Sequence, residues 1–339
     1  MQTPPLSTMA RPGSSAGVAG LSRGFGPRSW TKLFDAARRA LNALTLLTLA
    51  TVGTRAQAQE LEPKAYSNLP VGLNFLVLVY THSEGGLATD PALPIQGAQL
   101  ETHTGVIAYA RSLDLWGKSG KVDIILPFSQ LSGSALVAGQ PRERDITGLG
   151  DLRVRLAVNL YGAPALSMQG FPGFKPDLVI GASIQVSAPI GQYDPSKLVN
   201  LGSNRWSVKP DIGFSKAFGA LILDLTTGVT FYGDNDNYFG GKSFEQKPVY
   251  STQSNITYEF GRGKWISFGA TYYSGGRTSV NGVLNDDALS NSRAGMTFAL
   301  PVNRHNSVKF NLSRGVSIRT GTDFTSIGIA WQYRWGAGL

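Results

Sequence analysis

The carboxyl-terminal segment, residues 325–335, alternates strictly between two kinds of side chain. Its odd-numbered positions are mostly large and apolar and end in three aromatics: Thr325, Ile327, Ile329, Trp331, Tyr333 and Trp335. A period of two is typical of a β-strand with one apolar face. Such a face suits a strand whose outer side meets lipid, although a strand of a soluble β-sandwich with one buried face would alternate in the same way. How often the pattern recurs decides between the two interpretations.

Eleven further segments show similar alternation and are separated by clusters of Gly, Asn, Asp and Pro. The twelve predicted strands span residues 68–82, 99–113, 121–131, 150–161, 177–190, 205–218, 221–232, 249–260, 265–274, 292–302, 306–319 and 325–335. They have about 10–15 residues each, whereas soluble strands have ~5–6 and a tilted membrane strand needs ~9–11. Long and short connections alternate along most of the chain, as the outer loops and periplasmic turns of a membrane barrel do. We therefore predict an all-β fold: a transmembrane, antiparallel, up-and-down β-barrel of about 12 strands.

The amino-terminal segment, residues 1–58, has the features of a secretory signal peptide with an extended lead. A basic stretch at residues 32–39 precedes a short apolar run at residues 40–52, and the segment ends in the small-x-small sequence Ala-Gln-Ala. The apolar run is shorter than the ~20 residues of a spanning helix. We expect cleavage after Ala58, export across the inner membrane, and an outer-membrane barrel formed by residues 59–339. An amphipathic organellar transit peptide is the alternative, but it would not explain the Ala-x-Ala ending.

The formal net charge of +9 overstates the charge of the predicted barrel. Residues 1–58 hold seven of the 31 basic residues and one of the 22 acidic residues, which leaves 24 basic and 21 acidic residues in the rest of the chain. A nucleic-acid-binding function inferred from the whole-chain charge would rest on a segment that we expect to be removed. We therefore expect no nucleic-acid partner. The absence of cysteine excludes disulfides and thiolate chemistry.

Seven stretches of the predicted mature chain match the sequence of a known family: residues 109–128, 139–144, 148–151, 186–195, 201–207, 301–306 and 328–333. Through them the chain resembles the outer-membrane proteins grouped as transporters of the meta-pathway of phenol degradation, from about Pro63 to Leu339. The resemblance implies a porin-like outer-membrane transporter, with membrane lipid, a small-molecule solute and the barrel-assembly machinery as partners. It supplies no catalytic residues. Residues 336–339 depart from the pattern, because outer-membrane strands commonly end on an aromatic.

If the apolar faces meet lipid, the opposite faces line the barrel interior, where charged residues need water or partners. The predicted lumen-lining or solute-binding residues are Glu101, His103, Tyr109, Arg153, Arg155, Lys209, Asp211, Asp224, Lys309 and Arg334. Basic groups are in excess, so a polar pore would favour anionic or phenolate-like solutes. The alternative is that these charges pair across strands and plug the interior.

We predict an outer-membrane channel or transporter for the uptake of small solutes, with aromatic compounds as candidates. The alternatives are a non-conducting structural or loop-mediated binding barrel and an outer-membrane lipid-modifying enzyme. A membrane hydrolase would need Ser and His together on the lipid-facing surface. His103 is expected inside the barrel and His305 in a periplasmic turn, so we predict no enzyme activity and no catalytic residues.

No cofactor or metal site is expected either. With no cysteine and three histidines, zinc has little support. The polar cluster at residues 234–237 has oxygen ligands at alternating spacing that could hold Ca²⁺, but a solvated turn is the preferred interpretation.

Overall fold

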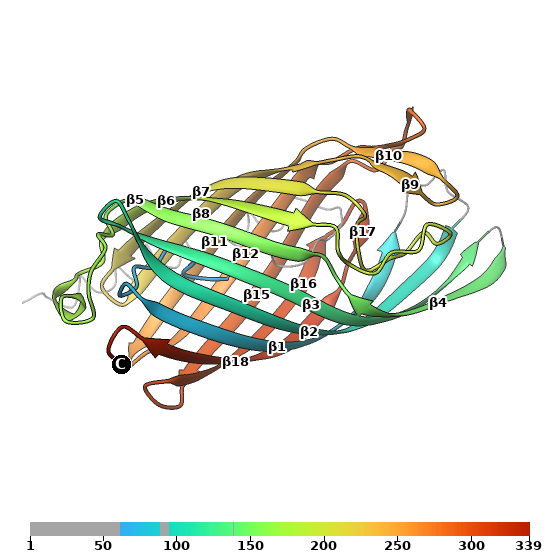
Figure 1. Ribbon diagram of the computed structural model, residues 1–339. Helices are drawn as coiled ribbons and strands as arrows, with labels where there is room; N and C mark the ends of the chain where they lie inside the picture. Colours follow the sequence, from blue (N-terminus) through green and yellow to red (C-terminus); the bar gives the residue numbers. More distant parts are fainter. Residues whose placement is uncertain (1–61, 89–94, 138) are drawn as a thin grey trace, which may run out of the picture. The chain divides into compact units, whose positions relative to one another are not determined.

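A closed, antiparallel β-barrel of twelve strands forms the body of the chain (Figure 1). The structure is a computed structural model that describes residues 62–88, 95–137 and 139–339. The predicted signal peptide, residues 1–58, lies outside the described residues. No helix in the described part of the chain is both long enough and apolar enough to cross a membrane.

The topology is up-and-down, because each barrel strand pairs with the barrel strands before and after it in the sequence. The barrel strands are β1 (Leu73–Ala88), β2 (Ile95–Leu115), β3 (Lys118–Val137), β5 (Leu152–Tyr161), β6 (Leu178–Ala188), β7 (Ser207–Phe218), β8 (Leu221–Tyr232), β11 (Val249–Gly261), β12 (Lys264–Gly275), β15 (Leu289–Pro301), β16 (Asn306–Ser317) and β18 (Thr325–Gly336). The first strand closes the ring, since β1 pairs with β2 on one side and with β18 on the other. The predicted fold class and strand number are confirmed.

The remaining elements lie in the connections. A single turn of 3₁₀-helix, η1 (Phe171–Gly173), lies in the connection between β5 and β6. At the outer end, β17 (Gly321–Thr322) pairs with β1, and β4 (Gln140–Leu149) pairs with the outer half of β3. A separate four-stranded sheet has the order β14 (Val283–Leu284), β13 (Thr278–Val280), β10 (Lys242–Gln246) and β9 (Asn235–Tyr238).

The two faces of the barrel wall differ as the alternation predicts. On β18, Ile327 and Ile329 are exposed on the outer face, whereas Ala330, between Ile329 and the next outward residue, is buried. The outward rings of Trp331, Tyr333 and Trp335 stack in a row at the carboxyl end of this strand. The Tyr333 centroid is 6.1 Å from that of Trp331 and 5.6 Å from that of Trp335. Aromatic side chains at this position are typical of a membrane–water boundary. The apolar outer wall and its aromatic end identify the lipid-facing surface.

Two predicted boundaries differ from the structure. The first strand begins at Leu73 instead of residue 68, because Pro70 has no amide proton for the ladder and Gly72 has a positive φ of 84°. Residues 132–147, predicted as a long outer loop, are largely a hairpin in which the ladder runs from Phe128↔Leu149 to Val137↔Gln140. This extension projects beyond the barrel at the end marked β4 in Figure 1. The consecutive charged residues 142–145 interrupt the alternation of apolar and polar side chains, so the sequence did not predict strands here.

Candidate functional site

The candidate site is the barrel lumen, and seven of the ten predicted lumen residues face it. On the inward positions of their strands lie Arg153, Arg155, Lys209, Asp211, Asp224, Lys309 and Arg334. Of these, Arg155, Lys209 and Asp211 are buried, whereas Arg153 is exposed to the interior space. Two tyrosines of the barrel wall, Tyr232 and Tyr273, also point inward, while Tyr161 points outward.

The other three predicted residues, Glu101, His103 and Tyr109, lie on the outer face of β2, which differs from the expectation. They share the face of Ile107, whose side chain is 59% exposed, while the alternate residue Ser112 is buried. The expectation rested on placing every charge inside. That rule holds only within the apolar band, about 25 Å tall, and Glu101 and His103 lie beyond its outer edge. Tyr109 lies near the periplasmic edge, where its ring centroid is 6.2 Å from that of Trp335.

Residues 62–72, which precede β1, form an inner segment that lies against the lumenal wall. Three of its side chains bond to three different strands: Glu62 to Lys309 on β16, Lys64 to Glu259 on β11, and Tyr66 to Asp211 on β7. Nearer to β1, the amide of Val71 donates to the carbonyl of Leu166 in the connection between β5 and β6 (2.9 Å). The inner segment therefore links opposite parts of the wall across the interior.

A recess in the wall holds the Tyr66 ring. Gly181 on β6 and Gly213 on β7 are paired neighbours, and a Cβ at either position would lie 2.1 Å from a ring carbon of Tyr66. Ala157 and Val179 pack around the same ring. Only glycine at both wall positions leaves room for the ring, so the wall and the inner segment are complementary in shape.

Beside the Tyr66 ring, a network of charged and hydroxyl groups extends across strands β3, β5, β6 and β7. The Arg155 Nε donates to the Ser183 hydroxyl (2.8 Å), and Ser183 donates to Asp211 (2.7 Å). The Arg155 guanidinium lies 3.6 Å from Asp211 and 3.9 Å from Asp123, and Lys121 lies 3.2 Å from Asp123. Removing one member of a buried network of this kind leaves an uncompensated charge, which costs free energy. Because Tyr66 joins the network through Asp211, the network fixes the position of the inner segment.

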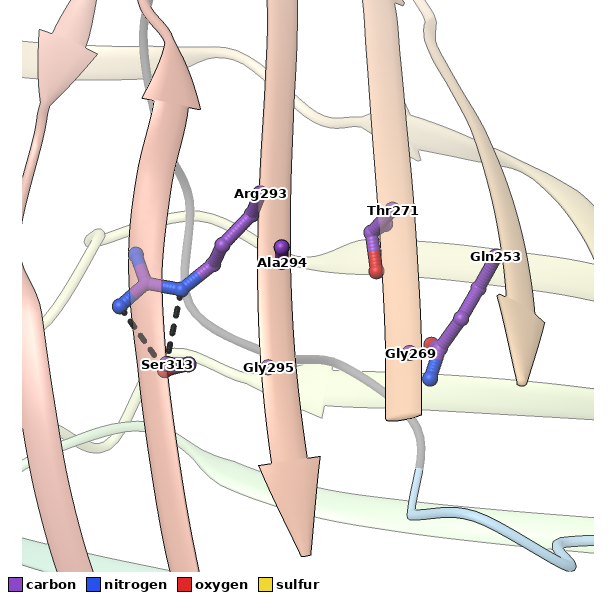
Figure 2. Close-up of a pocket in the computed structure, with 7 residues that line it drawn as sticks. All are labelled: Gln253, Gly269, Thr271, Arg293, Ala294, Gly295 and Ser313. Carbon is purple, nitrogen blue, oxygen red and sulfur yellow. Dashed lines mark hydrogen bonds between the residues drawn. The ribbon is translucent and has the colours of Figure 1, made fainter. Parts of the chain in front are cut away.

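On the opposite wall, Arg293 on β15 has a different environment. Its guanidinium hydrogen-bonds to the Ser313 and Ser326 hydroxyls and to the Phe324 carbonyl, and none of the described carboxylates pairs with it. Figure 2 shows the Arg293 side chain reaching toward Ser313 on the neighbouring strand, with Gly295 on its own strand and Gly269 on the strand beside it. A pocket on this wall is lined by Gln253, Gly269, Thr271, Arg293, Ala294, Gly295 and Ser313. This part of the lumen presents neutral donors and an uncompensated positive charge.

The outer mouth is built from loops that are tied to the barrel. Asp151, between β4 and β5, accepts hydrogen bonds from the amides of Gly191 (3.0 Å) and Ser203 (2.9 Å). Arg205 lies between the rings of Tyr232 and Phe244, at 4.5 and 4.8 Å from their centroids. Burial lowers the pKa of Arg205 from its usual value, and neighbouring tyrosine and aspartate groups oppose that shift. Residues 234–237, predicted as a solvated turn, instead contain most of β9, in which Asn235 is buried and forms hydrogen bonds with Asn204 and Tyr193.

The family model described as "Putative MetA-pathway of phenol degradation" matches residues 83–333. The chain belongs to this family. No curated protein matches it.

Among solved structures, the fold resembles that of the COG4313 outer membrane channel from Pseudomonas putida F1, with a TM-score of 0.70 at 23% sequence identity. That likeness covers 81% of this chain and 100% of the channel. The KdgM porin gives a TM-score of 0.43 at 10% identity, over 76% of this chain and 98% of the porin. The transport unit of the autotransporter AIDA-I from Escherichia coli gives 0.48 at 7% identity, over 81% and 93%. The likeness to the COG4313 channel shows that the fold is that of an outer-membrane barrel.

The residue that sequence reasoning missed is Tyr66. Residues 62–67 of the inner segment have no period, so nothing in them predicts contact with the wall. The available signal lies in the wall itself, where Gly181 and Gly213 occupy inward positions of neighbouring strands that otherwise carry side chains. Two paired glycines inside a barrel wall indicate a close approach by another group.

Proposed function

We propose that the chain is an outer-membrane channel for small, preferentially anionic solutes, with phenolate-like aromatic compounds as the candidate class. The observation that carries this proposal is the contrast between the two faces of the wall. The outer face is apolar and ends in aromatics, whereas the inner face is polar and carries Arg153 and Arg293 without a carboxylate partner among the described residues. A membrane barrel with a polar interior supports solute passage.

The inner segment narrows this passage. Glu62, Lys64 and Tyr66 occupy part of the cross-section: Glu62 and Lys64 form ion pairs with Lys309 and Glu259, and Tyr66 donates a hydrogen bond to Asp211. The remaining space is bordered by the Arg293 side of the wall, where charge is uncompensated. A narrow path beside fixed positive charge favours small anions over cations and over large solutes. The family description supports aromatic compounds as the class to test first.

The test is ion selectivity in planar bilayers, with liposome swelling as the measure of solute flux. We expect the purified protein to conduct, to show an anion-selective reversal potential in a salt gradient, and to pass benzoate-sized anions. The Arg293→Gln variant should lose part of the anion preference. Arg314→Gln is the matched control, because Arg314 lies on the outer face of the neighbouring strand β16 and should leave selectivity unchanged.

Absence of both conductance and swelling would reject the channel in favour of a non-conducting barrel. That alternative has support in the same contacts, since the inner segment and the Arg155 network fill part of the interior. A cation-selective conductance would keep the channel and reject the anionic class of solute.

A further inference from the structure

Two of the chain's three histidines face outward side by side near the outer end of the barrel. His82 on β1 is the direct cross-strand partner of His103 on β2, and their ring centroids are 4.9 Å apart. Glu101 lies on the same face and places Oε1 3.1 Å from His103 Nε2 and 3.8 Å from His82 Nδ1. We propose that His82, Glu101 and His103 form a binding site for a divalent transition-metal ion of the Zn²⁺ type.

The spacing of the three side chains fits one ion. A tetrahedral zinc site with bonds of ~2.0–2.2 Å has ligand atoms ~3.4 Å apart. The two distances from Glu101 Oε1, 3.1 and 3.8 Å, lie on either side of that value, and all three ligand atoms lie within 4.8 Å of one another. Two imidazoles and one carboxylate are ligands of zinc and of its neighbours in the transition series, and a fourth position stays open to water.

The groups around the three ligands orient them toward one point. The Tyr80 hydroxyl is 2.8 Å from His103 Nδ1, so it can accept that proton while Nε2 faces the ion. The Glu84 carboxylate lies 3.8 Å from His82 Nε2, which is an ion-pair distance and not a hydrogen bond, and its position beside Nε2 leaves Nδ1 for the ion. Histidine ligands of metals almost always donate their second ring N–H to such a group.

The His82 Nδ1 atom is the second indication of a ligand. It is buried and has no hydrogen-bond partner among the described residues, although it points toward Glu101. A buried polar atom without a partner costs free energy, and a bound ion would satisfy it.

The location makes the site accessible from solution. Along the outer face of β1 the side chains change from Leu78 and Tyr80 to His82 and Glu84, which is the change from apolar band to polar rim. The site therefore lies at the outer membrane–water boundary, on the lipid-facing side of the wall. It is separate from the lumen, so its failure would leave the channel proposal untouched.

The experiment is a Zn²⁺ titration of the purified protein in detergent by calorimetry, with any polyhistidine tag removed. Co²⁺ absorption in the visible range reports on tetrahedral coordination. We expect one ion per chain, with affinity reduced at least ~10-fold in His103→Ala and in Glu101→Gln, and to a smaller extent in Tyr80→Phe. His305→Ala is the matched control, because His305 is the remaining histidine and lies in a periplasmic turn.

Two results would overturn the proposal: no Zn²⁺ binding by the parent protein at millimolar concentration, or equal affinity in the parent and His103→Ala. Circular dichroism and the gel mobility of unheated samples show whether each variant keeps its barrel. His82→Ala gives an independent route to the same answer if His103→Ala does not fold.

Discussion

At the scale of single residues, Gly213 determines whether the Tyr66 ring can sit in the wall. A Cβ at position 213 would lie 2.1 Å from a ring carbon, so Gly213→Ala should displace the ring and the inner segment with it. We expect a loss of ~1–3 kcal/mol in the free energy of unfolding, the usual cost of overpacking, and a larger single-channel conductance. Denaturant unfolding followed by tryptophan fluorescence, together with bilayer recordings, measures both.

Gly105→Ala is the control for this change, because a Cβ there meets its nearest neighbour at 3.9 Å on the outer face of β2. It should leave stability and conductance near the parent values. If Gly213→Ala behaves like Gly105→Ala, the recess does not hold the inner segment.

A second residue, Asp194, makes the outer loop between β6 and β7 sensitive to acid. Hydrogen bonds from the Ser196 hydroxyl (2.7 Å) and amide (2.8 Å) hold the pKa of Asp194 below its usual value. A lowered folded-state pKa stabilises the loop above the unfolded-state pKa, and this stabilisation is lost as pH falls through the folded-state value. The protection of amides 194–200, measured as the exchange rate relative to the intrinsic rate at each pH, should therefore fall in acid, and Asp194→Asn should lack this protection already at pH 7. Equal exchange of the two proteins at pH 7 would contradict this role.

At the scale of elements, the inner segment can be tested as a unit. Deleting residues 62–67 removes the partners of Asp211, Glu259 and Lys309 and vacates part of the lumen. We expect a larger conductance and a lower thermal unfolding midpoint, while the barrel itself persists because its twelve strands pair without the inner segment. Bilayer recordings and thermal circular dichroism are the measurements.

Tyr66→Phe separates volume from bonding in the same experiment. It keeps the ring in its recess but removes the hydrogen bond to the Asp211 carboxylate, and a bond to a charged group is worth ~1.5–3 kcal/mol. Its conductance should stay at the parent value while its free energy of unfolding falls by that amount. A conductance as large as that of the deletion would mean that the hydrogen bond, and not the bulk of the segment, limits the passage.

At the scale of the whole molecule, the barrel was predictable from sequence because the alternation of apolar and polar side chains recurs in every strand. Each of the twelve predicted segments overlaps a barrel strand, since a period of two reports which positions face lipid. Which strands meet depends on long-range register, so the pairing of Arg155 with Asp211 was not predictable, although the inward position of both was. The outward position of His103 was not predictable either, because the edge of the apolar band is set by neighbouring strands.

The orientation of the wall leads to a prediction for the intact barrel. The chain has no cysteine, so single cysteines report on one site each. Ile184 and Gln185 are adjacent on β6, and Ile184 is 47% exposed on the outer face while Gln185 points inward. In proteoliposomes, a charged, water-soluble thiol reagent should label Gln185→Cys at least ~10-fold faster than Ile184→Cys, because hydrocarbon excludes charge. A membrane-soluble maleimide should show the opposite preference. Equal labelling of both positions by the charged reagent would place the apolar face in water and contradict a membrane-spanning barrel.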